Sequence, residues 1–353
     1  MSRGRTPSQQ YRYFAQTGAA ASPLYEHVSI AFSESSAALR AIEAAPARRR
    51  QPALILAALH DLALAGHAPA LAEAYANADS EAAAAAAIAT LLHMGDSVAA
   101  IAARRRMQTI AFEHCAVLYP AITAAAQWAG ADSIGLIDAG CSAGVNLTAD
   151  LAEITYSGVL SLGDPASPLK VRSSIKGAHP VPARSAPAVT VRIGIVPDPI
   201  DVTDADDARW LRACIPPDQP ERAAQLEAMR TLAAAAHAEH LRGDPVSVLA
   251  SAFAHVPAGA LPVVLTTWSL SQLPHESRLR FVHQLRDAAR DRPVAWVSAE
   301  GVGVAPTVPT LGDRRASGHS IIGVAFAENS DFSAEAVGRC WSRGRIVEWL
   351  AGP

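Results

Sequence analysis

Apolar residues in the first third of the chain recur with the 3.6-residue period of an α-helix. In the segment Gln51–Ala65, Ile55, Leu59 and Leu62 fall on one helical face, and Gly66 follows as a suitable residue to end the helix. We find no strand-like alternation and no internal repeat in this part of the chain. The pattern predicts a region built entirely of helices.

A further helix is expected just ahead of the first strand. The segment Gln108–Trp128 is apolar over most of its length, which is typical of a buried helix. Pro120 lacks an amide hydrogen, so we expect it to kink or split this helix.

After Gly130 the pattern changes to short apolar runs that alternate with helical stretches, as in βαβ units and mainly parallel sheets. The candidate strands are Ile134–Ala139, Thr190–Val196, Glu239–Arg242, Pro262–Thr267, Val294–Ser298, Ser320–Ala327, Val337–Trp341 and Arg345–Trp349. Residues 158–187 are expected to form a long surface loop, and residues 201–240 an insertion of two helices. The sequence thus predicts an α/β fold: an all-helical region over residues 1–130, then a Rossmann-like domain over residues 131–353.

Composition and charge argue against several classes of function. The 353 residues carry a net charge of −3 without a basic block, so we expect neither a nucleic-acid groove nor a membrane-binding surface. The four cysteines are far apart and form no CxxC or Cys/His cluster, so no metal site is expected. Scattered thiols and an N-terminus without a long apolar run are typical of a cytoplasmic protein. The oligomeric state stays open.

The segment Ile134–Leu147, IGLIDAGCSAGVNL, has the pattern of a strand, a glycine turn and a helix start. Asp138 lies at the strand end, Gly140 and Gly144 bracket the turn, and a helix is expected from Gly144. Glycines leave room for a ligand against the backbone, and a helix start offers free N–H groups and a positive dipole end. Asn146 adds a polar side chain there. The segment predicts a nucleotide-binding turn.

Besides an ordinary turn that binds nothing, two known motifs compete for this segment and fit it poorly. A dinucleotide fold needs GxGxxG, but Ser142 stands where the second glycine belongs. The letters GCSAG also match the GxSxG elbow of serine hydrolases, with Ser142 as the nucleophile. That fold has strands ahead of the elbow, whereas this chain is helical there, and Asp313 and His319 lie close together in one loop.

A third motif, the [D/E]xGxGxG turn of methyltransferases, fits better. Asp138, Gly140 and Gly144 fall on its acid and on its first and last glycines, and Ser142 replaces the middle glycine. In methyltransferase sheets an acid after the third strand accepts a hydrogen bond from adenine, and Asp244 is in position for this role. As an alternative, Asp244 simply caps a turn.

Polar residues also end the fourth predicted strand. Thr266, Thr267 and Trp268 are expected to border the cofactor or substrate, because open α/β sheets bind ligands at the carboxyl ends of their strands. Trp268 is equally compatible with a core position. The second strand should end in an acid for the ribose hydroxyls, but Val196 stands there and Asp198 follows two residues later.

The whole chain resembles a family known only as domain of unknown function 2332, which has a helical N-terminal half and a methyltransferase-like C-terminal half. The resemblance implies this fold and S-adenosylmethionine as the cofactor, but it implies no substrate. It rests on SPLYEH (22–27), ALHDLALAGHAPALAEAY (58–75), DAGCSAGVNL (138–147), PIDVTDADDARWL (199–211), RGD (242–244), VVLTTWSLSQLP (263–274) and WVSAEG (296–301).

Two departures from the family pattern affect the expected pocket. The family tends to have Gln-Thr-Asn-Glu followed by arginine ahead of the first strand. Here Gln-Thr is present at 108–109, Ile110 and Ala111 replace the polar pair, and His114 falls near the arginine position. The family also tends to have an acid where this chain has Val196. These changes predict an altered substrate or a loss of activity.

Methyl transfer needs alignment, exclusion of water and sometimes a base, without a metal or a nucleophile from the enzyme. The candidate bases are Glu300, at the end of the fifth strand, and His114 and Glu113, on the segment ahead of the first strand. We expect an S-adenosylmethionine-dependent methyltransferase that acts on a small molecule, with the helical region as a lid. A catalytically degenerate binding or scaffold protein is the alternative.

Overall fold

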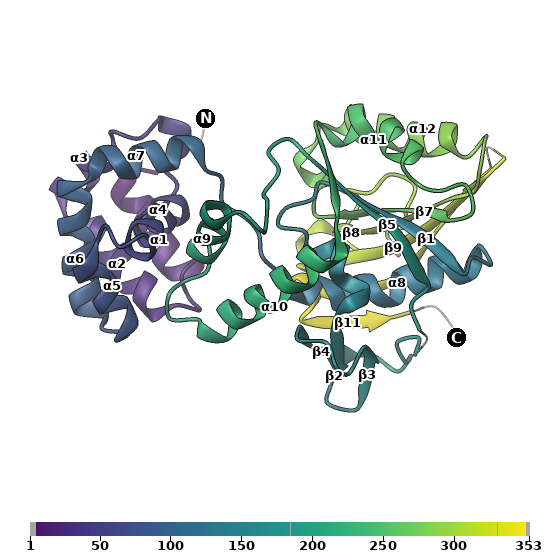
Figure 1. Ribbon diagram of the computed structural model, residues 1–353, viewed down its shortest axis with the longest axis horizontal. Helices are drawn as coiled ribbons and strands as arrows, with labels where there is room; N and C mark the ends of the chain where they lie inside the picture. Colours follow the sequence, from purple (N-terminus) through teal and green to yellow (C-terminus); the bar gives the residue numbers. More distant parts are fainter. Residues whose placement is uncertain (1–4, 184, 330, 351–353) are drawn as a thin grey trace. The chain divides into compact units, whose positions relative to one another are not determined.

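The computed structural model describes residues 5–183, 185–329 and 331–350, which form two compact units (Figure 1). The first unit comprises residues 1–110 and 201–227, and the second comprises residues 111–200 and 228–353. The helix predicted just ahead of the first strand therefore lies in the second unit, and most of the predicted insertion packs with the first.

Short amphipathic or buried helices with local caps build the first unit. Its helices are α1 (Pro7–Thr17), α2 (Pro23–Glu34), α3 (Ser36–Ile42), α4 (Pro52–Leu64), α5 (Pro69–Ala76), α6 (Ser80–His93), α7 (Gly95–Arg104) and α9 (Ala205–Ala213). Side chains of Thr6, Ser22 and Asp79 accept hydrogen bonds from the first turns of α1, α2 and α6. Helix α4 lies in the core, where Ile55 and Leu59 are fully buried. The predicted all-helical character of this part is confirmed.

The predicted insertion folds against the other helices of the first unit. Asp204 caps α9, and the fully buried Trp210 on that helix donates a hydrogen bond to the carbonyl oxygen of Arg106 (2.9 Å). Arg209 on α9 pairs with the buried Asp61 of α4 at 2.9 Å. Helix α10 (Pro220–Ala236) follows and includes the point at which the chain passes to the second unit.

An eleven-stranded, mostly parallel sheet forms the centre of the second unit in the described residues. The strand order is β3-β2-β4-β11-β10-β9-β8-β7-β1-β5-β6. The strands are β1 (Ser133–Ala139), β2 (Glu153–Tyr156), β3 (Leu160–Gly163), β4 (Lys170–Lys176), β5 (Ala188–Val196), β6 (Glu239–Arg242), β7 (Leu261–Thr267), β8 (Val294–Gly301), β9 (Ser320–Glu328), β10 (Asp331–Trp341) and β11 (Ile346–Trp349). The neighbours β6, β5, β1, β7 and β8 are parallel, and β9 and β10 are antiparallel to their neighbours. The predicted α/β class with a mainly parallel sheet is confirmed.

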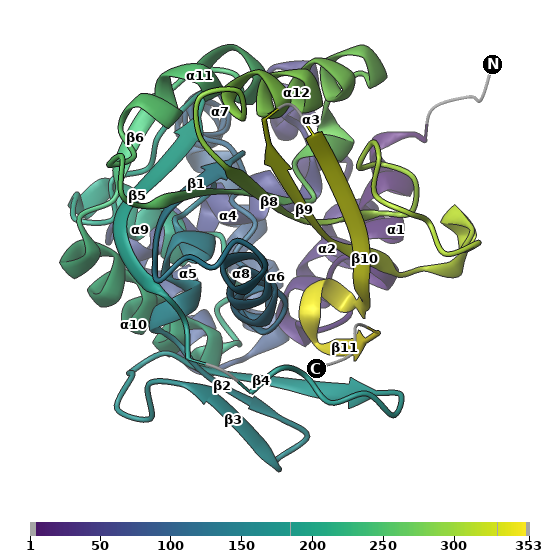
Figure 2. The ribbon, with the colours of Figure 1, turned by 90° about the vertical axis from the view of Figure 1, so that its right-hand side faces the viewer.

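Helices cover both faces of the parallel strands. Helix α8 (Cys115–Trp128) packs on β7, β8 and β9, whereas α11 (Pro245–Ala254) and α12 (His275–Ala288) pack on the other face (Figure 2). Buried Ile137, Val264 and Trp296 form part of the core between the sheet and α11 and α12. The strand order reverses between β1 and β7, so their carboxyl ends meet at the point where open sheets of this kind bind ligands.

Two local expectations were wrong. Residues 158–187 were expected to be a loop, but they contain β3 and β4, which pair with β2 in a small extension of the sheet. The helix expected after Gly144 is a short 3-10 helix, η3 (Val145–Leu151), so an α-helical crossover after β1 is absent. Strands β2 and β3 form a local hairpin, whereas β4 also pairs with β11, about 170 residues later in the chain, which the local pattern does not show.

Pro120 was expected to kink or split its helix, and it does not split it, because a distant side chain satisfies the backbone group that proline frees. Helix α8 runs from Cys115 to Trp128 with Pro120 inside. Proline leaves the carbonyl oxygen of residue 116 without its helical donor. The hydroxyl of Tyr156 on β2 donates to that oxygen of Ala116 at 2.6 Å.

Within the described residues, the structure has no single helix that is both long and apolar enough to cross a membrane.

Candidate functional site

Two glycines hold the turn after β1 in a conformation that other residues rarely adopt. Gly140 has a φ of +110° and Gly144 a φ of +79°. A Cβ atom on Gly140 would lie 2.4 Å from Cβ of Ser269, so this position also needs glycine for space. The amide groups of Gly140 and Cys141 both donate to the carbonyl oxygen of Ile195 at 3.1 Å, which fixes the turn to β5.

The short helix η3 beyond the turn is anchored by a buried ion pair. Arg192 on β5 makes a two-pronged contact with the carboxylate of Asp150, at 2.6 and 2.7 Å, and also donates to the carbonyl oxygen of Leu147. Both charged side chains are 9% exposed, so removal of either would leave a buried charge unpaired. This contact holds Asn146 in a fixed position relative to β1.

The side chain of Asn146 joins three segments of the second unit. Its amide nitrogen donates to Oδ2 of Asp138 (3.0 Å), at the end of β1, and to Oγ1 of Thr267 (2.6 Å), at the end of β7. Its Oδ1 atom lies 3.0 Å from Nδ1 of His114, which precedes α8. Asp138, Asn146 and His114 are all buried. Residues that the sequence singled out separately therefore meet in one hydrogen-bonded group.

This geometry fixes which nitrogen of His114 bears the proton. Because Asp138 and Thr267 accept from the NH2 group of Asn146, the amide oxygen faces the imidazole. An amide oxygen only accepts, so Nδ1 of His114 is the donor, and Nε2 of the neutral ring carries a lone pair. Nε2 is buried and has no hydrogen-bond partner in the described part of the chain. His114 therefore presents a buried basic nitrogen.

Burial shifts the pKa values of both ends of this group toward the neutral forms. The pKa of Asp138 is raised to about 7 by desolvation, which outweighs the hydrogen bonds from Asn146 and the Cys141 thiol. The pKa of His114 is lowered to about 4, mainly by desolvation, with a smaller contribution from the charge of Arg343. His114 is therefore neutral near pH 7, as a proton acceptor must be.

Trp268, the first residue after β7, has a strained backbone and a fixed ring. Its φ is +54°, a value that costs a bulky residue free energy. The indole nitrogen donates to Oγ of Ser320 at 2.8 Å, and the ring centroid lies 4.6 Å from that of His114. Trp268 thus covers one side of the imidazole, and it is half-buried rather than part of the core.

Glu300, predicted as a base at the end of β8, lies beneath the loop that begins with Trp268. It is 1% exposed, and Oε1 accepts from the amide of Leu270 at 2.9 Å. Desolvation raises the pKa of Glu300 to about 7, while hydrogen bonds from the amides of Leu270, Ser269 and Ser271 act in the opposite direction. These contacts indicate a positioning residue for the loop, whose Oε2 has no partner within the described residues.

The remaining candidates on this edge have other surroundings. Thr266 is buried and accepts from the indole of Trp296 at 2.9 Å, as a core residue does. Glu113 pairs with Arg345 at 3.1 Å, and Ser142 is half-buried in the turn after β1. Of the residues predicted for this edge, Asn146 is the one with a hydrogen bond to His114 in the contacts described.

The acids proposed for the adenosine portion of a cofactor lie farther along the sheet. Val196 ends β5 and is buried, and Asp198 lies two residues beyond it. Asp244 follows β6 and accepts hydrogen bonds from the amides of Val246 and Ser247, so it caps α11 as the alternative interpretation predicted. A pocket of about 510 Å³ opens beside it.

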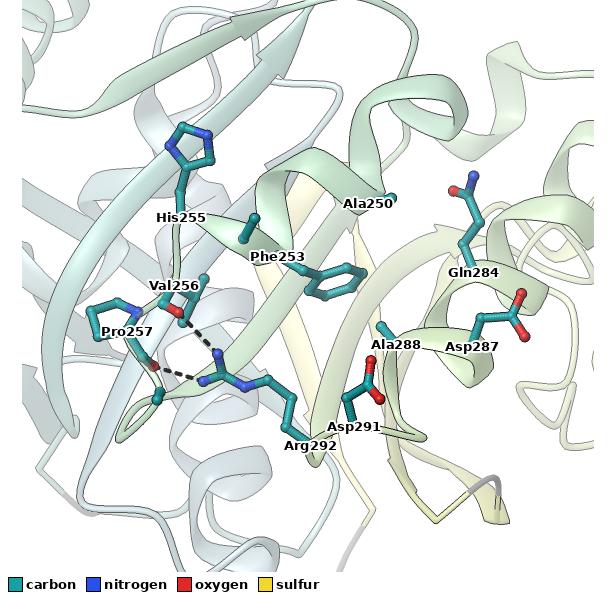
Figure 3. A pocket seen from close by; sticks show the side chains of 12 residues that line it. Ala250, Phe253, His255, Val256, Pro257, Gln284, Asp287, Ala288, Asp291 and Arg292 are labelled. Carbon is teal, nitrogen blue, oxygen red and sulfur yellow. Dashed lines mark hydrogen bonds between the residues drawn. The ribbon is translucent and has the colours of Figure 1, made fainter.

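A larger cavity lies at the other edge of the sheet, between α11 and α12. It measures about 930 Å³ and is lined by residues that precede β7 and β8, at the amino ends of these strands (Figure 3). Arg292 is already held there, since it donates to the carbonyl oxygens of Val256 (2.9 Å), Pro257 (2.7 Å) and Ala260. The volume is therefore separate from the Asp138–Asn146–His114 group.

Sequence reasoning missed one group at the carboxyl edge, the loop before β11. Ser342, Arg343 and Gly344 have φ values of +48°, +58° and +104°. A Cβ on Gly344 would lie 2.1 Å from the carbonyl oxygen of Glu113, so the loop is pressed against the segment that contains His114. The only local signal was a Ser-Arg-Gly tripeptide between two short strands, which does not reveal its partners.

No group of three or more His, Cys, Asp or Glu residues in the described part of the chain is arranged to hold a metal ion.

Comparison with known proteins places the chain in one group only. A family model described as "Uncharacterized protein conserved in bacteria (DUF2332)" matches residues 8–349. No curated protein and no solved structure matches the chain.

Proposed function

The chain belongs to the bacterial family DUF2332, and we propose that its second unit binds S-adenosylmethionine and transfers the methyl group to a small-molecule acceptor. The observation that supports this most directly is the bridge from Asp138 through Asn146 to Thr267, because it joins β1 and β7 where the strand order reverses. Ligands of open α/β sheets bind at this position. In chain order these parallel strands are arranged 3-2-1-4-5, as in doubly wound nucleotide-binding sheets, which supports the proposal.

The residues at this edge fit two parts of the cofactor, its amino-acid portion and its adenine, but not its ribose. The glycine turn, with Asp138, Gly140, Ser142, Gly144 and Asn146, would hold the amino-acid portion. Asp244 would accept from the adenine amino group, because β6 lies two strands from β1, or about 10 Å at ordinary strand spacing.

The departure is at the ribose. Val196 offers no acceptor at the end of β5, so Asp198 would have to reach back to the hydroxyl groups.

When bound, S-adenosylmethionine supplies a methyl group that is already activated on a sulfonium sulfur. His114 would take the proton that the acceptor loses, because its unprotonated Nε2 is buried and unpartnered. Asn146 holds the ring in the required tautomer, and Glu300 positions the loop that carries Trp268. Such positioning is the main contribution that a protein makes when the cofactor is activated.

A methyltransferase fold that binds a ligand without turnover is the second candidate. Val196 and the apolar pair Ile110 and Ala111 favour it, since polar residues are expected there for an active site. In contrast, the serine-hydrolase interpretation finds no support in the fold: residues 5–132 contain no strand, so β1 is the first strand of the described chain.

Titration calorimetry with S-adenosylmethionine and S-adenosylhomocysteine tests the proposal on the full chain. We expect saturable binding, weakened at least tenfold by Asn146→Ala and unchanged by Asn77→Ala, an exposed asparagine of the first unit. Absence of heat with both ligands at 1 mM, in protein with native circular dichroism, would contradict cofactor binding. Labelling of Ser142 by a fluorophosphonate would instead revive the hydrolase.

A further inference from the structure

Arg343 is a cation at the carboxyl edge whose surroundings differ from those of its neighbour. Its guanidinium carbon lies 5.5 Å from the ring centroid of Trp268, the same ring that packs against His114. Within the described residues no carboxylate pairs with Arg343, whereas Arg345, two residues later, pairs with Glu113 at 3.1 Å. Arg343 is thus an exposed cation beside Trp268, without a carboxylate partner in the described part of the chain, and its charge acts on His114.

The backbone holds Arg343 there at a cost in free energy. Its φ is +58° and that of Ser342 is +48°, and each such residue costs on the order of 1 kcal/mol or more. Gly344 locks the loop against the carbonyl oxygen of Glu113, one residue before His114. Trp268, on the other side of the contact, is strained in the same way and fixed by Ser320. Two residues with strained backbones, Trp268 and Arg343, are therefore in contact although they are far apart in sequence.

We infer that Arg343 and Trp268 form the recognition subsite for an anionic acceptor, a small molecule with a carboxylate or phosphate group. The flat part of the acceptor would lie against the indole, and its oxyanion would pair with the guanidinium, whose planar donors match such groups. The atom to be methylated would then face Nε2 of His114. This substrate class rests on the proposed methyl transfer, but the binding of anions at this contact does not.

The test uses the full chain labelled with 5-fluorotryptophan and no S-adenosylmethionine. The fluorine resonance of Trp268 is identified by its loss in Trp268→Phe. Benzoate, phenyl phosphate and the neutral benzamide serve as probes of similar shape. We expect saturable shifts of the Trp268 resonance with the two anions, and at least fivefold weaker binding of benzamide.

Arg343→Gln is expected to weaken anion binding at least fivefold. Arg290→Gln, which changes the net charge equally at an exposed position two residues after the end of α12, should leave the dissociation constant within a factor of two. The tighter of the two anions assigns the subsite to a carboxylate or to a phosphate. Equal binding of benzamide and benzoate, or equal binding to the wild type and Arg343→Gln, would overturn the inference.

The outcome is separable from that of the calorimetry. Anion binding without S-adenosylmethionine binding would retain the subsite and remove the methyltransferase proposal. The reverse result would retain the cofactor and remove the subsite.

Discussion

The central sheet differs between the amino ends of its parallel strands, the amino edge, and their carboxyl ends, the carboxyl edge. The two differ in cavity volume and in the buried polar atoms that lack a hydrogen-bond partner. The amino edge has the larger cavity, but its arginine, Arg292, is bonded to three carbonyl oxygens. Within the described residues, the carboxyl edge has buried polar atoms without partners on Asp138, His114 and Glu300, against one beside the cavity, on Gln284, and it has strained backbone at Trp268 and Arg343. Folding alone does not account for such features, because they lower stability. Unpaired buried groups and strain therefore indicate function better than cavity volume does in this molecule.

The largest expected effect contrasts one glycine at each edge. Gly344→Ala should lower the free energy of unfolding by about 4 kcal/mol, because a Cβ would meet a backbone oxygen at 2.1 Å and φ is +104°. Gly259→Ala, at the amino edge, meets nothing within 4 Å and should change stability by less than about 0.5 kcal/mol. Denaturant titration measures both, and equal effects would remove the contrast between the edges.

The next effect depends on pH and on Glu300. Its pKa is about 7 in the folded protein, against an ordinary value of 4.5, so the folded state binds more protons between these values. Stability from this group is full below pH 4.5 and is lost as the pH rises through 7. Glu300→Gln should therefore gain up to about 3 kcal/mol relative to wild type between pH 4.5 and 8. A difference that stays constant over this range would show that the carboxyl is not buried as described.

Asn146→Ala should cost about 2 kcal/mol, because it removes a donor from Asp138 and the partner of His114 in a buried group. Asp291→Ala, on the cavity at the amino edge, should have little effect because that carboxylate is exposed. Thermal unfolding of both variants gives the comparison. A larger loss for Asp291→Ala would reverse the roles assigned to the two edges.

The smallest expected effect is a gain in stability rather than a loss. The hydroxyl of Ser269 is buried without a partner in the described residues, so Ser269→Ala should raise stability by about 0.5 kcal/mol. If this hydroxyl is retained for a ligand, the same variant should bind S-adenosylmethionine more weakly. A variant that loses stability would instead point to a hydrogen bond within the folded chain.

Local pattern was enough to predict the parts of the fold that depend on neighbouring residues. The helices of the first unit follow their apolar period, and β6 was predicted with its observed bounds, Glu239–Arg242. The turn at Gly140 was predicted because Gly140 and Gly144 follow an apolar strand with Asp138 at its end. The strands β3 and β4 were not, since their composition is that of a loop, and β4 also pairs with β11, which comes from a distant segment.

The candidate site divides in the same way. Asp138, Asn146, His114 and Thr267 were each chosen from the sequence, but the hydrogen bonds among them depend on the order of the strands. Arg343 could not be chosen, because nothing around it in the sequence distinguishes it from the other arginines. Its position follows from the contact of one loop with the carbonyl oxygen of Glu113, 231 residues earlier than Gly344.

The hydrogen bond from Tyr156 to Ala116 has a consequence for synthesis of the chain. Helix α8 contains Pro120, and the carbonyl oxygen of Ala116 obtains its hydrogen-bond donor only from Tyr156, 40 residues later. A ribosome adds about 5–20 residues each second, so on the order of 2–8 s pass before that partner has been made. During this interval the nascent helix has an open carbonyl at its second residue. Its final closure therefore requires β2, so completion of this helix is tied to formation of the small sheet extension.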